Sequence, residues 1–235
     1  MKYFIADNHF YHANILNMDN RDFENISDMS EYMIERWNRK VKSDDEVYVL
    51  GDFSWEKGPK TWDILVRLHG KIRLVEGNHD YYYLDDSSFD DSVFESINCY
   101  DEFKENKRRC IMSHYPMPFY NHQFNSETYM LYGHVHNTYD EYMLNRFIND
   151  ASRLNRDVAS GEVKTTPFHM INVFCAFSDY EPLSLDEWII VDDKRRKMIN
   201  EFESKCGGLI DPQNWYEFNI ETLNILKEEI HKEEE

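Results

Sequence analysis

The feature that most constrains the fold of this chain is a series of short apolar runs, each followed at once by a polar cluster. Short apolar runs bounded by turn residues are typical of buried strands. A sixth run, residues 170–177, contains no acid or histidine. The five runs that end in a polar cluster are residues 3–6, 47–50, 72–75, 110–112 and 129–132.

Two stretches between the first runs are predicted to be helical. Asp28 and Glu31 have the spacing of a capping box, and apolar residues at helical spacing follow them. Thr61 is predicted to cap a shorter helix that ends before Gly70. Alternating strands and helices predict an α/β fold with parallel neighbouring strands. Ligands of such sheets bind beyond the carboxyl ends of the strands, which is where the polar clusters lie.

The rest of the chain is less regular. Residues 85–105 hold eight acids and one lysine, which favours a solvated loop and helix face. Residues 145–168 have weak periodicity and are predicted to form an inserted surface excursion. Helical patterns return beyond residue 192, with one helix expected over 193–206 and a last helix from about residue 219.

The composition argues against several classes of protein. The 26 basic and 45 acidic residues leave a net charge of −19. This charge disfavours stable binding of duplex nucleic acid, because that binding depends on lysine and arginine contacts. The first apolar run is too short for a signal peptide, and no stretch approaches the roughly 18 apolar residues of a membrane span. We therefore expect a cytoplasmic protein without a membrane segment. The four cysteines lie far apart and form no C-x-x-C pair, so neither a zinc knuckle nor a disulfide scaffold is indicated. They are Cys99, Cys110, Cys175 and Cys206.

The polar clusters have the composition of a two-metal site. In order they read D-x-H, G-D, G-N-H-D, H and G-H-x-H. Two divalent cations roughly 3.5–4 Å apart can clamp the attacking and leaving oxygens of a phosphoryl transfer. Cations this close need a bridging anion, and Asp52, in the middle of the set, is the best candidate. Imidazole combined with carboxylate and amide oxygen favours manganese, iron or zinc.

The spacing within two clusters predicts how they face the site. Asp7 and His9 are two residues apart, as are His134 and His136. Residues two apart in an extended segment face the same side, so we expect both pairs to point into one crevice from extended backbone. Glycines before candidate ligands permit a tight turn or a close backbone approach, and they are Gly51, Gly77 and Gly133.

The same ordered motifs resemble those of the calcineurin-like metallophosphoesterase superfamily. Its small bacterial and phage-type group is similar in the segments D-N-H-F-Y-H-A-N-I, E-R-W-N, V-Y-V-L-G-D-F, L-Y-G-H-V-H-N and Y-E-P-L-S-L-D-E-W. The resemblance covers residues 1–192, with the excursion at 145–168 inserted in that domain. It implies a four-layer α/β/β/α sandwich of two mixed sheets, with a dinuclear metal site at the carboxyl ends of the strands. Residues 193–235 would form a helical extension packed on the same domain.

The resemblance also implies a role for each motif residue. A hydroxide bridging the two metals would attack phosphorus, and His79 would stabilise the developing charge or protonate the leaving oxygen. Asp52 would bridge the metals. The first metal would take Asp7, His9, Asp52 and His136, and the second would take Asp52, Asn78, His114 and His134.

Three further residues are candidates for substrate binding. His12 continues the D-x-H-x-x-H pattern, and either contacts the substrate phosphate or supports His9 from behind. Asn14 follows it, and Arg21 is the basic residue nominated for phosphate. Asp80, after the motif histidine, is interpreted as a helix cap or turn acid rather than a ligand.

We therefore expect a metal-dependent phosphoesterase that acts on a small phosphorylated substrate, either a phosphodiester or a nucleotide. A nuclease or a nucleotidase of the same superfamily is the alternative enzyme. The alternative outside enzymology is a catalytically weak nucleotide-binding module. The pattern leaves the oligomeric state open.

Overall fold

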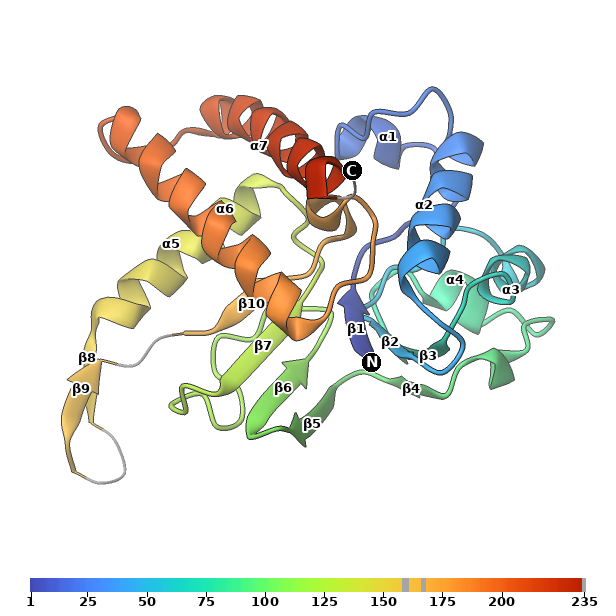
Figure 1. The fold of residues 1–235 in the computed structure, drawn as a ribbon, viewed down its shortest axis with the longest axis horizontal. Helices are drawn as coiled ribbons and strands as arrows, with labels where there is room; N and C mark the ends of the chain where they lie inside the picture. The colour runs from blue at the N-terminus through green and yellow to red at the C-terminus, as the bar shows by residue number, and fades with distance from the viewer. Residues whose placement is uncertain (158–160, 166–167, 234–235) are drawn as a thin grey trace.

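The computed structural model describes residues 1–157, 161–165 and 168–233, and its centre is a pair of four-stranded sheets (Figure 1). The first sheet is parallel throughout, in the order β1 (Lys2–Ile5), β2 (Glu46–Val49), β3 (Lys71–Val75) and β4 (Ser96–Asn98). The second sheet is mixed because β5 alone runs antiparallel, in the order β10 (Met170–Asn172), β7 (Thr128–Tyr132), β6 (Arg108–Met112) and β5 (Asp101–Glu105). The predicted α/β class is confirmed, although only one of the two sheets is mixed.

Alternation along the strands of the second sheet produces its two buried faces. Cys110 and Met112 belong to the large core cluster shared with the first sheet. Ile111, which lies between them, packs instead in a separate cluster with Ile148 and Ala151 of α5 (Tyr139–Arg153). Successive strand residues point to opposite faces, so one face of β6 meets the first sheet and the other meets a helix.

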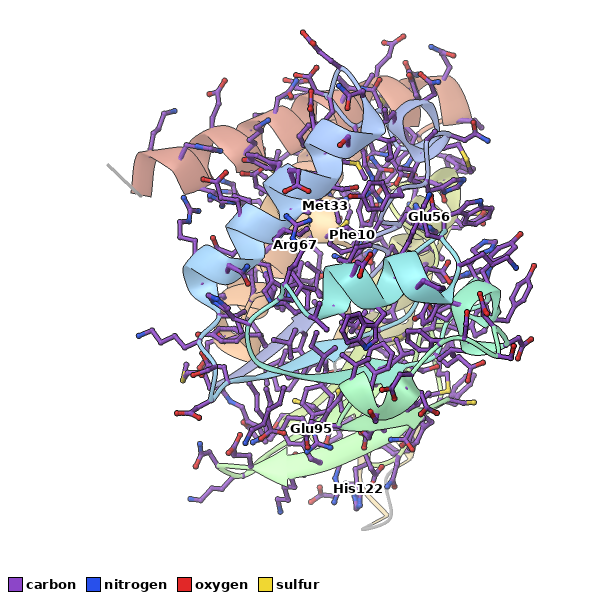
Figure 2. All side chains as sticks on the ribbon, turned by 90° about the vertical axis from the view of Figure 1, so that its right-hand side faces the viewer. Phe10, Met33, Glu56, Arg67, Glu95 and His122 are labelled. Carbon is purple, nitrogen blue, oxygen red and sulfur yellow. The ribbon has the colours of Figure 1, made fainter. Side chains whose placement is uncertain are left out.

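The outer face of the first sheet is covered by α2 (Ile26–Lys40) and α3 (Gly58–Leu65), which Figure 2 views from the outside. Met33 is buried on the inner side of α2, as the helical spacing predicts. The start of α2 differs from the prediction, because Asn25 is the cap and its side chain accepts from the Asp28 N–H at 2.9 Å. The start of α3 also differs. Thr61 lies within that helix and donates to the Ser54 hydroxyl at 2.9 Å.

Residues 85–105 contain two edge strands, so the prediction of a solvated loop and helix face was wrong for much of this segment. β4 adds to the first sheet, and β5 pairs with β6 over five residue pairs. Ile97 and Phe103 pack against the core, while the acidic residues occupy half-buried or exposed positions. Edge strands tolerate charged side chains, so an acidic edge strand is difficult to distinguish from a solvated loop in the sequence.

The predicted excursion at 145–168 begins later than expected. Its first nine residues belong to α5, whose side chains at 148 and 151 are buried. The segment that projects from the body is the hairpin of β8 (Asn155–Asp157) and β9 (Val163–Thr165), seen at the lower left of Figure 1. Residues 158–160 and 166–167 of the predicted excursion lie outside the described residues.

The two last helices also begin earlier than predicted. α6 (Leu185–Lys205) starts at a capping box formed by Ser184 and Glu187, so the predicted domain boundary at residue 192 falls inside a helix. Its buried Trp188 donates to the Phe4 carbonyl of β1 at 2.9 Å. α7 (Pro212–Glu233) begins seven residues before the predicted start. No helix among the described residues is long and apolar enough to cross a bilayer.

The short helices are α1 (Ile15–Met18), α4 (Tyr81–Leu84), η1 (Asp91–Val93) and η2 (Cys175–Ser178).

Candidate metal centre

The two sheets meet at their carboxyl edges, and this junction brings the polar clusters together. The Ala6 N–H donates to the Val173 carbonyl at 2.9 Å, and the Cys175 N–H donates to the Ala6 carbonyl at 3.0 Å. The end of β1 is thereby paired with the segment that follows β10. The loops after β1, β2, β3, β6 and β7 consequently surround one site.

The ligand loops do not have the extended backbone that the spacing predicts. The φ angles are 57° at Asp7, 52° at His9, 69° at His134 and 46° at His136, all in the left-handed region. Asp52 also has a positive φ of 53°. Non-glycine residues rarely adopt this conformation, and it is found repeatedly at functional sites. The pairs still reach one site, but they do so through turns rather than through strand alternation.

All three predicted glycines are required for the close approach of these loops. Gly51 has a φ of 83°, and a Cβ atom there would clash with the His114 ring and with the Gly77 backbone. A Cβ atom on Gly77 would lie 2.5 Å from the Asp52 backbone nitrogen and its Oδ1. A Cβ atom on Gly133 would lie 2.6 Å from Oδ2 of Asp7. Real side chains do not tolerate such contacts, so all three positions depend on the absence of a Cβ.

A first group of ligand atoms gathers around His9. One side-chain atom each from Asp7, His9, Asp52 and His136 lies within 4.8 Å of the others. The Nε2 atoms of His9 and His136 are 3.2 Å apart. Nε2 of His9 lies 3.7 Å from Oδ2 of Asp52, and Nε2 of His136 lies 3.6 Å from Oδ1 of Asp7.

A second group lies on the other side of Asp52. Oδ1 of Asn78 is 3.0 Å from Nε2 of His114 and 2.9 Å from Nδ1 of His134. These two imidazole nitrogens are 3.2 Å apart. Oδ2 of Asp52 is 3.6 Å from Nε2 of His114. All seven residues predicted as ligands therefore lie in two adjoining groups that share Asp52.

The donor atoms of both groups suit cations. Nδ1 of His136 lies 2.8 Å from Asp19, and Nδ1 of His114 lies 2.9 Å from the Leu50 carbonyl. Because each of those nitrogens donates a proton to an acceptor, each Nε2 has its lone pair directed at the centre. A lone pair there faces another nitrogen at 3.2 Å, an arrangement that a cation between the two would satisfy.

The pKa shifts of several of these residues agree with such a site, while the pKa of His136 is raised because burial, which opposes the shift, is outweighed by the charges of Asp7 and Asp19. Burial lowers the pKa of His114 to about 4 and that of His9 well below its ordinary value, which keeps both rings neutral. Burial also raises the pKa of Asp7 to about 7, and the charge of Asp52 contributes in the same direction. Carboxylates that are buried without enough positive charge are stabilised by a bound cation.

Arg21 does not face the site as a phosphate ligand, so that prediction was wrong. Its side chain is 0% exposed, and its Nε and Nη2 donate to Asp19 at 3.1 and 2.8 Å. The remaining donors reach the backbone carbonyls of Asp7 and Asn8, both at 2.8 Å. Arg21 therefore holds the loop after β1, which contains the left-handed residues Asp7 and His9, and the carboxylate of Asp19.

Asp19 is a site residue that the sequence analysis missed. One carboxylate oxygen accepts from His136 and the other accepts from Arg21. Carboxylates that orient a ligating histidine in this way fix its tautomer and its ring position. An acid two residues from an arginine is too common a pattern to have singled it out.

Asp80 holds two ligand loops together. It is fully buried, and its carboxylate accepts from the backbone N–H groups of Asp52 at 3.0 Å, Phe53 at 2.9 Å and Gly77 at 2.7 Å. The Tyr83 hydroxyl donates to it at 2.8 Å. The prediction of a non-ligand helix cap or turn acid agrees with this position. Asp80 is the N-cap residue of α4, although its side chain makes no capping hydrogen bond to that helix.

The remaining candidates differ in position. His79 is one-third exposed; its N–H donates to Oδ1 of Asp52 at 2.8 Å, and its Nε2 is 4.0 Å from Oδ2. His12 is buried and stacks on Trp55, with ring centroids 3.8 Å apart, next to His9. Burial lowers the pKa of His12 to about 4. Asn14 is exposed and makes no hydrogen bond to either ligand group in the described structure.

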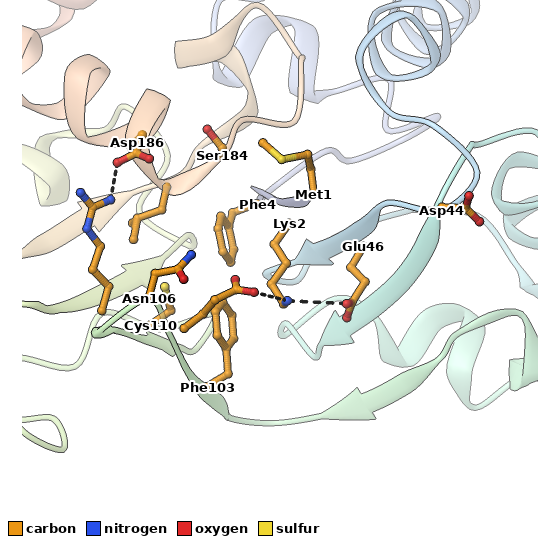
Figure 3. Close-up of a pocket in the computed structure, with 13 residues that line it drawn as sticks. Met1, Lys2, Phe4, Asp44, Glu46, Phe103, Asn106, Cys110, Ser184 and Asp186 are labelled. Atoms are coloured by element: carbon orange, nitrogen blue, oxygen red, sulfur yellow. Dashed lines mark hydrogen bonds and ion pairs between the residues drawn. The ribbon is translucent and has the colours of Figure 1, made fainter.

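A cavity of about 630 Å³ lies at the opposite edge of the sheets (Figure 3). Its two basic side chains, Lys2 and Arg108, are both engaged by carboxylates. Lys2 lies 3.3 Å from Glu105 and 3.7 Å from Glu46. The cavity therefore does not resemble a phosphate site, and the chemistry belongs to the carboxyl edge.

Comparison with known proteins decides the family. Residues 5–159 match the family model described as the calcineurin-like phosphoesterase superfamily domain. The chain belongs to this superfamily. This phosphoesterase is 33% identical to the uncharacterized protein MJ1445 of Methanocaldococcus jannaschii. The 187 aligned residues cover 78% of this chain and 86% of that protein.

A solved structure is also similar to this phosphoesterase. The protein of unknown function AQ665 from Aquifex aeolicus superposes with a TM-score of 0.53 at 26% identity, over 80% of this chain and 96% of that chain. The family match confirms the predicted resemblance. Membership in the superfamily supports, in general terms, a metal-dependent phosphoesterase.

Proposed function

We propose that this phosphoesterase holds two divalent cations and hydrolyses small phosphodiesters or nucleotides. The observation that carries the proposal is the position of the Asp52 carboxylate. Its Oδ2 lies 3.7 Å from Nε2 of His9 in one ligand group and 3.6 Å from Nε2 of His114 in the other. A single carboxylate between two sets of imidazole ligands is what a bridged pair of cations requires.

The proposed ligands fit manganese, iron or zinc better than calcium, because five donors in the two groups, including His9, are not carboxylates and most of them are imidazoles. When bound, the cations would supply positive charge to the phosphate oxygens and to the attacking water. Asp19 accepts the Nδ1 proton of His136, which leaves Nε2 as the metal-binding nitrogen of the neutral ring, and the Leu50 carbonyl does the same for His114. The two groups are those of Asp7, His9, Asp52 and His136, and of Asp52, Asn78, His114 and His134.

His79 is proposed as the catalytic residue at the mouth of the site. Its backbone is held by Asp52, and one-third of its side chain remains open to solvent, so its ring can reach a substrate. Donation of a proton to the leaving oxygen, or stabilisation of the developing charge, is the chemistry that an imidazole supplies there. His12, beside His9, is proposed to support that ring, and its contact with Trp55 favours this over direct phosphate binding.

Charge supports a small substrate. Two dications balanced by Asp7 and Asp52 would leave about two positive charges in the site, enough to attract a phosphate locally. The net charge of −19 on the whole chain opposes extended contact with a duplex. A small phosphodiester or nucleotide can use the site without meeting the acidic surface.

The test is hydrolysis of a chromogenic phosphodiester and of the matching monoester with Mn²⁺, in the wild type and in Asp52→Asn. Asp44→Asn, an exposed acid in the loop before β2, is the matched control. We expect diester turnover that Asp52→Asn abolishes and Asp44→Asn retains. A preference for the monoester would indicate a nucleotidase, and metal binding without any turnover would indicate a nucleotide-binding module.

A further inference from the structure

The C-terminal helix α7 lies beyond the part of the chain that matches the family, yet it contacts a ligand loop directly. The indole N–H of Trp215 donates to the Asn137 carbonyl at 3.1 Å and to the Thr138 carbonyl at 2.8 Å. The side-chain amide of Asn219, one turn later, donates to the same Asn137 carbonyl. Trp215 is 2% exposed and Asn219 is 4% exposed. The loop they hold carries His134 and His136.

This loop needs donors from elsewhere in the fold. Its left-handed residues direct carbonyls away from any regular ladder, and a buried carbonyl without a donor is costly. The Asn172 side chain donates to the His136 carbonyl at 2.7 Å, so β10 holds one end of this stretch. The next carbonyl, that of Asn137, accepts from both Trp215 and Asn219 of α7, whereas the Thr138 carbonyl accepts from Trp215 and also from the Glu141 N–H at 3.1 Å. The backbone beside His136 is therefore held from two sides.

Dense packing around the loop does not take over the role of the hydrogen bonds from Trp215 and Asn219. A cavity of about 200 Å³ adjoins the contact, lined among others by Asp19, Asn137 and Trp215. A loop that borders a cavity has fewer packing contacts than a loop in a dense core, so its hydrogen bonds matter more for its position. The donors on α7 therefore help to set the position of the loop next to Asp19 and His136.

α7 is itself well anchored, so it can act as a fixed support. The Tyr139 hydroxyl donates to the Ile210 carbonyl at 2.8 Å, and the Ile210 N–H donates to the Tyr142 hydroxyl at 3.0 Å, just before the helix begins. Trp215 packs against Tyr142 with ring centroids 5.0 Å apart. Near the other end, Nε2 of His231 lies 3.0 Å from the buried Asp179.

We propose that Trp215 and Asn219 are positioning residues for the metal centre, and that α7 sets the metal affinity of the loop that carries His134 and His136. The proposal rests on the metal site of the proposed function. Partners that orient metal ligands typically contribute about 10–100-fold to metal affinity. α7 would then be part of the functional unit rather than a covering helix.

The test compares Trp215→Phe with Trp37→Phe. Trp37 is equally buried, and its indole donates to a backbone carbonyl, that of His69, at 2.9 Å, but that bond joins α2 to the loop after α3. The full-length protein is stripped of metal and titrated with Mn²⁺ by calorimetry, with thermal unfolding measured in parallel. We expect Trp215→Phe to weaken Mn²⁺ binding about tenfold or more, and Trp37→Phe to lose stability with unchanged affinity.

A second variant keeps the proposal testable if Trp215→Phe folds poorly. Asn219→Leu removes the amide donor at nearly constant volume and should weaken Mn²⁺ binding in the same way. Saturating Mn²⁺ should restore turnover in both variants, because only positioning is lost. Equal Mn²⁺ affinity in Trp215→Phe, Asn219→Leu and Trp37→Phe would overturn the proposal. A wild type that binds no Mn²⁺ would instead overturn the proposed function.

Discussion

The hydrogen bonds of Asp19 make Asp19→Asn an informative substitution, because the variant has nearly the same shape but cannot satisfy both neighbours. The carboxylate accepts from His136 at 2.8 Å on one oxygen and from Arg21 at 2.8 Å on the other. An amide has one oxygen. If that oxygen faces the Arg21 guanidinium, the NH₂ group of the amide faces Nδ1 of His136. Because an NH₂ group only donates, Nδ1 must accept and the imidazole proton moves to Nε2, which then cannot bind a metal.

The expected magnitude follows from burial. The side chains of Arg21 and Asp19 are 0% and 2% exposed, and removing one partner of a buried ion pair costs about 3–5 kcal/mol. Arg21 keeps the carbonyls of Asp7 and Asn8, so we expect a loss near 3 kcal/mol. For a chain of this size that loss lowers Tm by about 6–12 °C. The wrong tautomer should weaken metal binding by about 10–100-fold.

The matched control is Glu141→Gln. Glu141 and Arg195 form another buried pair, with distances of 2.8 and 2.9 Å and side chains 3% and 4% exposed, between α5 and α6. Thermal unfolding of the two variants should show losses of similar size. Mn²⁺ titration should show weak binding only in Asp19→Asn. Equal Mn²⁺ affinity in the two variants would refute the assignment of Asp19 as the residue that orients His136.

Three other predictions concern the site itself. Asp52→Asn should lose at least one of two bound metals, because it removes the shared carboxylate; metal content by elemental analysis checks this, and two metals retained would contradict the bridge. His79→Ala should keep both metals but lose about 10²–10⁴-fold in kcat, more with poor leaving groups than with activated ones, and an equal loss with both would mean that His79 positions the substrate rather than donating a proton. Chelation should lower Tm, since a metal present at 1,000 times its Kd stabilises the fold by about 4 kcal/mol, and an unchanged Tm would indicate that the site binds no metal tightly.

The predicted strands match the structure closely. Each of the five runs with a polar end is a strand displaced by no more than about two residues, and every candidate ligand follows one of them. Parallel strands of one sheet bring their carboxyl ends to one edge, so the order of motifs along the chain is enough to predict that Asp7, Asp52 and Asn78 converge. The roles assigned to these residues remain proposals.

Local signals were less decisive at the helix ends. Asn25 and Asp28 are both good capping residues, and only the extended backbone of Asn25 decides which of them begins α2. The same ambiguity moved the start of α7 from Pro212 to residue 219 in the prediction. The strands β4 and β5 were missed because their pairing partners, not their own acidic residues, make them strands.

The strands, the candidate ligands at their ends and the family follow from the sequence, because all of these depend on patterns of a few neighbouring residues. Tertiary structure alone decided how that set is supported. Asp19 meets His136 across 117 positions, and Trp215 meets Asn137 across 78. Such contacts leave no local periodicity, since their geometry exists only after the sheets have paired and the last helix has packed against them.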